Sequence, residues 1–139
     1  MKKDTKGIGK LHDLNLRIMS MPFSEALVEV MDAYNIKVEQ LEKSSLLCKK
    51  TISRYRCGYT KYTKVSVVQL CLGMQCHIST SQILLFKAGY VLGSSYEDVV
   101  YSLILENVKS FDIYTANELI VSVNNTLIFR EDMITPFSE

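Results

Sequence analysis

The sequence from residue 38 to residue 63 reads VEQLEKSSLLCKKTISRYRCGYTKYT, and it decides how the rest of the chain is interpreted. Its pattern predicts two short helices, over 38–45 and 48–57, with Gly58 ending the second in a left-handed conformation. The apolar residues expected to face inward are Val38, Leu41, Ile52 and Tyr55. Two short helices joined by a tight turn have the dimensions of a helix-turn-helix unit.

Positive charge is concentrated in the same part of the chain. The whole sequence has 16 basic and 15 acidic side chains, a net charge of +1. Residues 37–64 hold eight basic side chains against two acidic ones, a net of +6. Residues 1–36 balance at zero, and residues 65–139 hold three basic against eight acidic side chains, a net of −5. A basic segment followed by an acidic body favours a polyanionic partner.

Length and composition are those of one globular domain. The chain has 139 residues, of which 47% are apolar and 22% charged. No run approaches the roughly 18 apolar residues that a membrane-spanning helix needs. The first ten residues are basic and lack the apolar segment of a secretory signal. We therefore expect a cytoplasmic protein with no membrane partner.

Catalytic and metal-binding motifs are not found in the sequence. The two histidines are 65 positions apart, and there is no H-E-x-x-H, G-x-S-x-G or Gly-rich phosphate loop, so we expect no enzyme. The four cysteines lack C-x-x-C spacing, so no zinc site is expected and the thiols should be mostly buried, small apolar side chains. We identify no cofactor, metal or small-molecule ligand. Cys48, beside two lysines at a helix start, has redox sensing as its alternative role.

Further helices are predicted on both sides of the central stretch. Apolar residues at helical spacing predict one helix over 22–34, ended by Asn35, and a nearly all-apolar, central helix over 64–74. Three more are predicted towards the C-terminus. Their expected N-terminal caps are Ser79 or Ser81, Ser94 or Ser95, and Asp112, and Gly89 should end the first of the three.

The two ends of the chain are predicted to differ from this helical body. Residues 1–10 are rich in lysine and glycine and are expected to be mobile. Residues 13–19 alternate in polarity like a short strand, although a helix through Leu11, Leu14 and Ile18 also fits. A β-prone run over 126–129 suggests a two-stranded pairing of 14–19 with 126–130.

The central stretch resembles the helix-turn-helix of the Xre family, the Cro and lambda-repressor type. The strongest matches are Leu41, Leu47, the run Lys50–Arg54 and Gly58. FSEALVEVMDAYNI and VVQLCLGMQ resemble the family's first and fourth helices, and ILLFKAGYVL and ANELI resemble C-terminal helices of a bacterial subgroup. The match is best over about residues 22–92.

The resemblance implies a mostly α, lambda-repressor-like bundle extended by about three C-terminal helices. It divides the chain into an N-terminal arm (1–21), a helix-turn-helix DNA-binding region (22–76) and a C-terminal helical extension (77–139) that is a candidate dimerisation region. The implied function is a sequence-specific transcriptional regulator that binds double-stranded DNA as a homodimer, bacterial and nucleoid-associated when bound. Two recognition helices about 34 Å apart would read a two-fold site.

Residue by residue, the resemblance implies two groups of DNA contacts. The base contacts, to guanine O6 and N7, are Lys49, Lys50 and Arg54. The backbone contacts are Thr51, Ser53, Arg56, Lys61 and Lys64. All the residues of 48–57 that are expected to face outward are polar, and no acidic residue occurs between Lys43 and Lys87.

Several positions depart from the family pattern. Glu42 stands where a small alanine is usual, Leu46 where glycine is usual, and Cys48 where a capping serine or threonine is expected. Val38 and Tyr62 replace the frequent glutamine and proline. Glu42 is expected either to pair with Lys43 or Lys49 or to force the two helices apart. The alternative function is therefore a degenerate helix-turn-helix that binds a protein without specific DNA binding.

Overall fold

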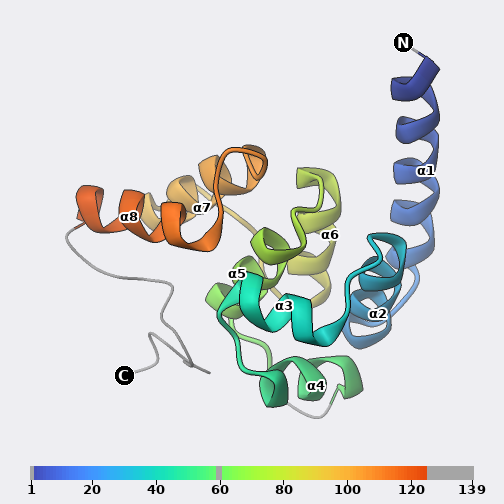
Figure 1. The fold of residues 1–139 in the computed structure, drawn as a ribbon, viewed down its shortest axis with the longest axis horizontal. Helices are drawn as coiled ribbons and strands as arrows, with labels where there is room; N and C mark the ends of the chain where they lie inside the picture. Colours follow the sequence, from blue (N-terminus) through green and yellow to red (C-terminus); the bar gives the residue numbers. More distant parts are fainter. Residues whose placement is uncertain (1, 59–60, 125–139) are drawn as a thin grey trace.

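The computed structural model describes residues 2–58 and 61–124, and over these residues it contains eight helices and no strand (Figure 1). The helices are α1 (Lys2–Met19), α2 (Phe23–Ala33), α3 (Val38–Ser45), α4 (Lys49–Cys57), α5 (Lys64–Met74), α6 (Ile78–Lys87), α7 (Tyr96–Glu106) and α8 (Ile113–Asn124). The prediction of a mostly α protein is confirmed. None of these helices is long and apolar enough to cross a membrane.

The N-terminal segment is a helix, so the strand predicted over 13–19 is wrong and the helical alternative for this segment is confirmed. Residues 2–10 begin the same helix. Leu14 and Ile18, four residues apart, are buried, whereas Leu16 is 55% exposed. Helical spacing, and not alternation, therefore selects the buried side chains. The proposed partner strand, 126–130, lies outside the described residues.

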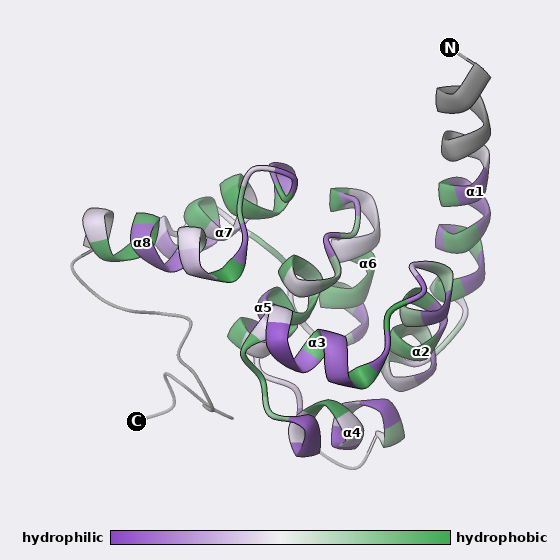
Figure 2. Ribbon diagram, viewed as in Figure 1, coloured by the Kyte–Doolittle hydropathy of each residue, from purple (hydrophilic) through white to green (hydrophobic). Residues whose placement is uncertain are grey.

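Helix α5 is the centre of the core, as its apolar composition predicted. It contacts α3, α6, α7 and α8, and every residue from Val65 to Leu72 is buried. Figure 2 shows apolar residues on the neighbouring helices α6, α7 and α8 as well. Because other helices cover α5 on several sides, it is apolar all round, whereas a surface helix has only one apolar face.

Gly73 lets α3 approach the backbone of α5 closely. A Cβ atom at Gly73 would lie 3.0 Å from Ser44 Oγ, 3.0 Å from Ser45 Cβ and 3.1 Å from Leu41 Cδ1. All three atoms belong to α3, so α3 rests directly on the core helix.

We expect Gly73→Val to lower the free energy of unfolding by about 1–3 kcal/mol, because the added atoms overpack the α3–α5 contact. Urea unfolding followed by circular dichroism measures this. Gly9→Val is the control, since a Cβ at Gly9 meets nothing within 4 Å. Equal stability of the two variants would show that α3 yields to the added side chain at no cost.

Most of the predicted helix ends are confirmed. Asn35, Gly58 and Gly89 have positive φ values of 55°, 77° and 98°. Ser95, rather than Ser94, caps α7 by accepting from Asp98 N at 3.1 Å. Asp112 Oδ1 accepts from Thr115 N at 2.8 Å at the start of α8. Neither predicted serine caps α6; His77 Nδ1 accepts from Ser79 N at 3.1 Å instead.

Candidate nucleic-acid interface

Helices α3 and α4 form the predicted pair, joined by three residues. Leu47 is fully buried, and Leu46 adopts the left-handed conformation with φ 64° although the family pattern has glycine there. A left-handed residue with a side chain costs about 1–2 kcal/mol. Leu46 is only 8% exposed, and burying a leucine stabilises by a similar about 1.5–3 kcal/mol. The turn therefore keeps its tight shape without glycine.

The inner face of α4 is anchored in an aromatic cluster. Tyr55 is 1% exposed, and its ring centroid lies 6.1 Å from that of Phe23 and 5.0 Å from that of Tyr62. Its hydroxyl accepts a hydrogen bond from Thr63 N at 3.3 Å. Ile52 is fully buried on the same face. These contacts hold α4 against α2 and against the segment that leads into α5.

The opposite face of α4 is exposed and cationic. Its members, here termed the α4 outer face, are Lys49, Lys50, Ser53 and Arg54, all exposed. Lys50 and Arg54 are four residues apart and therefore lie one above the other on the helix. The structure thus brings the three residues predicted to contact bases to one surface.

Not every residue predicted to contact the DNA backbone reaches that surface. Thr51 is 2% exposed, so its predicted outward orientation is wrong. Thr51 lies on the same buried side of α4 as Ile52 and Tyr55. Its Oγ1 lies 3.2 Å from Cys48 Sγ. Arg56 is half-buried, whereas Lys61 is exposed.

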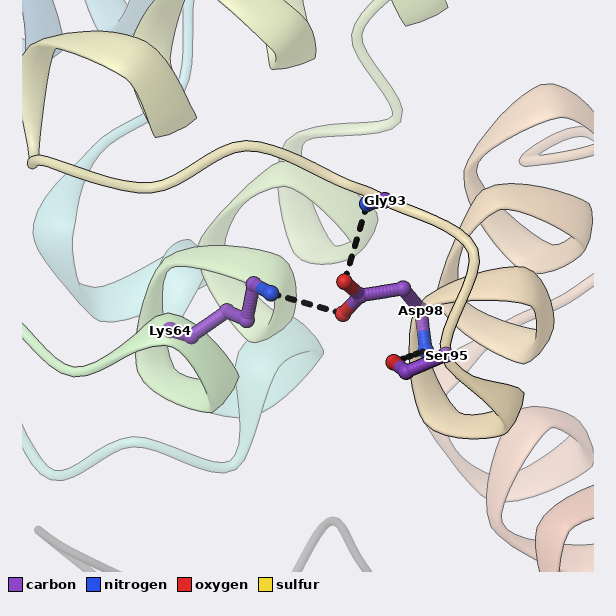
Figure 3. A network of polar contacts seen from close by, with 4 residues as sticks. All are labelled: Lys64, Gly93, Ser95 and Asp98. Atoms are coloured by element: carbon purple, nitrogen blue, oxygen red, sulfur yellow. Dashed lines mark hydrogen bonds and ion pairs between the residues drawn. The ribbon is translucent and has the colours of Figure 1, made fainter.

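Lys64 is held in an ion pair with the C-terminal half of the structure (Figure 3). Its Nζ lies 2.7 Å from Asp98 Oδ1, while Asp98 Oδ2 accepts from Gly93 N at 2.9 Å. Burial raises the pKa of Asp98, but the hydrogen bonds from Lys64 and Gly93 N and the Lys64 charge outweigh burial. The net pKa lies below its usual 3.8. Lys64 therefore joins the start of α5 to the start of α7 instead of facing outward.

We expect Asp98→Ala to lower the free energy of unfolding by about 2–4 kcal/mol at pH 7, because it leaves a half-buried ammonium without its partner. The pKa of Asp98 is depressed in the folded state, so its contribution is present above the unfolded value near 3.8 and is lost as the pH falls through the lower folded value. The difference between wild type and variant should therefore shrink below about pH 4. Urea unfolding at several pH values, with the exposed neighbour Glu97→Ala as control, measures both effects. A difference that stays constant down to pH 2 would contradict the ion pair.

Two carboxylates of α3 contact the first residue of α4, and the sequence did not reveal this role. Glu42 Oε2 accepts from the backbone N–H of Lys49 at 2.9 Å, and Glu39 Oε2 lies 3.1 Å from Lys49 Nζ. The Glu39 backbone N–H and the Lys49 ammonium lower the pKa of Glu39. Cys48, the N-cap residue, makes no side-chain capping bond. Of the alternatives predicted for Glu42, pairing with Lys49 agrees best with the structure. The bond, however, is to the backbone N–H of Lys49 and not to its ammonium group.

Helix α5 also holds the turn between α3 and α4. Gln69 is fully buried, and its Nε2 donates to Ser45 O at 2.9 Å. Ser45 Oγ in turn accepts from Leu47 N at 3.1 Å. The backbone at the end of α3 is therefore tied to the core helix by one side chain and to the turn by another.

The four cysteines differ in burial. All four belong to the described residues and remain thiols; Cys71 and Cys76 are buried, Cys48 is half-buried and Cys57 is exposed. The prediction of buried thiols is therefore confirmed for two of the four cysteines. Across residues 2–58 and 61–124, no group of three or more His, Cys, Asp or Glu side chains is placed to hold a metal ion.

The α3–α4 pair thus combines a buried inner face, a rigid turn and an exposed cationic outer face. Searches against protein-family models, curated proteins and solved structures found no match to this chain.

Proposed function

We propose that this protein binds double-stranded DNA in a sequence-specific manner and regulates transcription, with α4 as the recognition helix. The observation that carries the proposal is the α4 outer face: Lys49, Lys50 and Arg54 exposed opposite a fully buried side of the same helix. A helix of this kind can lie in the major groove while its partner helix crosses the backbone. The proposal includes a lambda-repressor-like arrangement of α2–α5, of the Xre type, extended by α6–α8.

The proposed contacts divide by chemistry. Lys50 and Arg54 would contact guanine O6 and N7, with Lys49 at the start of the helix. Ser53, Arg56 and Lys61 would contact phosphate. Thr51 and Lys64 are left out of the proposed interface, because Thr51 is buried and Lys64 is paired with Asp98.

The acidic part of the chain supports one orientation on DNA. Among the described residues of the C-terminal half, the exposed carboxylates are Glu97, Glu106, Asp112 and Glu118. Helices α7 and α8 lie away from α4 in Figure 1. Phosphate attracts the basic side of the molecule and repels the acidic side, so α4 would lead the approach.

The proposal is tested by recovering sheared genomic DNA on the immobilised protein and sequencing it. Wild type should recover discrete sites, and the triple variant Lys49→Ala/Lys50→Ala/Arg54→Ala should not. Equal recovery of the same sites by both proteins would remove α4 from the recognition surface. A wild type that recovers no specific sites would refute sequence-specific binding.

A second candidate function is protein binding through the apolar surface of α7. Tyr96, Val99 and Leu103 fall at helical spacing on this helix and are 58%, 53% and 49% exposed. Salt discriminates the two functions. DNA binding that neutralises several phosphates weakens steeply as salt rises, whereas apolar association does not.

The homodimer is part of the DNA-binding proposal and has its own measurement. A two-fold DNA site presents two half-sites about 34 Å apart, which two copies of α4 would fill. Light scattering of the complex with a recovered DNA fragment should give two chains per duplex. One chain per duplex would reject the dimer without rejecting DNA binding.

A further inference from the structure

We propose that Glu42 is a positioning residue for DNA recognition: its carboxylate fixes the first turn of α4 to α3 and so sets how Lys50 and Arg54 are presented to base edges. This inference rests on the proposed DNA-binding function and deepens it. Glu42 itself is not proposed to touch DNA bases.

The bond from Glu42 replaces a local helix cap. The first four N–H groups of a helix have no acceptor within the helix. The side chain of the residue before the helix usually supplies an acceptor for one of them. Cys48 supplies no such bond here, whereas Glu42 Oε2 accepts from Lys49 N at 2.9 Å. A cap at position 48 would fix only the start of α4. A cap from Glu42 fixes the start of α4 relative to another helix.

The fixation continues from Glu42 to the core. Helix α3 rests on α5 at Gly73, and Gln69 of α5 donates to Ser45 O at the end of α3. Glu42 belongs to the same helix and is half-buried. Its bond to Lys49 N therefore links the recognition helix, through α3, to the most buried helix of the protein.

The charge of Glu42 gives this bond a consequence for specificity. The N-terminus of a helix is a favourable place for a phosphate group, and here a carboxylate occupies it. Glu39 holds the Lys49 ammonium at 3.1 Å at the same end of the helix. Phosphate is thereby disfavoured at the first turn, and Lys50 and Arg54 remain as outward cations of α4. Glu42 should therefore lower non-specific affinity while it preserves specific affinity.

The experiment uses five proteins: wild type, Glu42→Ala, Glu42→Gln, Cys48→Ser and the double variant Glu42→Ala/Cys48→Ser. Glu42→Ala should lower the urea midpoint, because Lys49 N loses its acceptor. The serine should restore the midpoint in the double variant by acting as a local cap. Each protein is then used to select sites from a library of DNA duplexes with a randomised central region.

The expected result is a stable double variant that has lost specificity. Its ratio of affinity for the site selected by wild type to affinity for the random duplexes should fall by about tenfold, the effect of about 1.4 kcal/mol. Glu42→Gln keeps an acceptor oxygen without the charge. It should select the same site as wild type but bind random duplexes about threefold more tightly, since one like-charge repulsion is removed.

The outcomes separate the two proposals. If wild type selects a site and the stable double variant keeps the wild-type ratio, Glu42 is only a cap and this inference is overturned. If the double variant does not fold, Glu42→Gln decides the question. In that case, an affinity of Glu42→Gln for random duplexes equal to that of wild type overturns the inference. If wild type selects no site, the proposed function fails and the inference fails with it.

Discussion

Replacing Lys50 and Arg54 together by alanine is expected to lower affinity for a selected DNA site by about 2–6 kcal/mol, or roughly 30-fold to 10⁴-fold. Both side chains are exposed on the same side of α4, one turn apart, and the buried face of the helix prevents another orientation. Fluorescence anisotropy with a labelled duplex at about 0.1 M salt, where the screening length is about 10 Å, measures the loss. The folded structure should be unaffected, because neither side chain is buried.

The control keeps the change in net charge and moves it elsewhere. Lys10→Ala/Lys109→Ala also removes two exposed positive charges, one from α1 and one from the segment between α7 and α8. We expect less than a threefold change in affinity for this pair, since charges beyond about 10 Å are largely screened at 0.1 M salt. Equal losses from the two double variants would mean that only net charge attracts DNA, and that α4 does not recognise it.

The salt dependence of DNA affinity is a second measurement on the same proteins. The slope of log affinity against log salt should decrease by about 0.9 for each phosphate that a removed cation neutralised. Lys50 and Arg54, if they contact bases, should change the preference among sequences more than the slope. A large change in slope with unchanged sequence preference would assign both residues to phosphate.

Tyr55→Ala should cause the largest loss of stability, about 3–5 kcal/mol, because it removes a fully buried aromatic side chain. The cavity would open between α2 and α4, where Tyr55 packs against Phe23 and Tyr62. Urea unfolding followed by circular dichroism measures the change. DNA binding should weaken with it, since α4 loses its main anchor.

Tyr55→Phe is the matched variant and separates packing from hydrogen bonding. It keeps the ring and removes only the hydroxyl that accepts from Thr63 N, so the loss should be about 0.5–1.5 kcal/mol. DNA affinity should stay near the wild-type value. A loss as large as that of Tyr55→Ala would show that the hydroxyl, and not the ring, holds α4 in place.

Helical spacing was sufficient to predict the central helices. The bounds of α3 and α5 match the predicted 38–45 and 64–74, because apolar side chains there recur with the helical period or fill the whole helix. Spacing was insufficient over residues 13–19, where the leucines and isoleucine fit both an alternating and a helical pattern. Packing against α2 and α6 decides that segment, since these contacts bury Leu14 and Ile18.

For the candidate site, the sequence predicted which side chains are exposed at some positions and not at others. The exposed cations of α4 follow from the inward positions of Ile52 and Tyr55, which place Lys50 and Arg54 on the other side. Thr51 was wrongly placed outward, because a polar residue next to the apolar positions can be buried when its hydroxyl finds a contact. Lys64 was predicted to face DNA, but its partner Asp98 is 34 residues away along the chain.

The sequence alone determined the helical class, the two-helix unit with its basic charge and the side of α4 that faces outward. These properties depend on residues within one or two turns of each other, and local spacing determines them. Only the tertiary structure decided that Glu42 caps α4, that Lys64 belongs to Asp98 and that Leu46 can take the place of glycine. Each depends on contacts between different helices, or on burial against them, which no local pattern specifies.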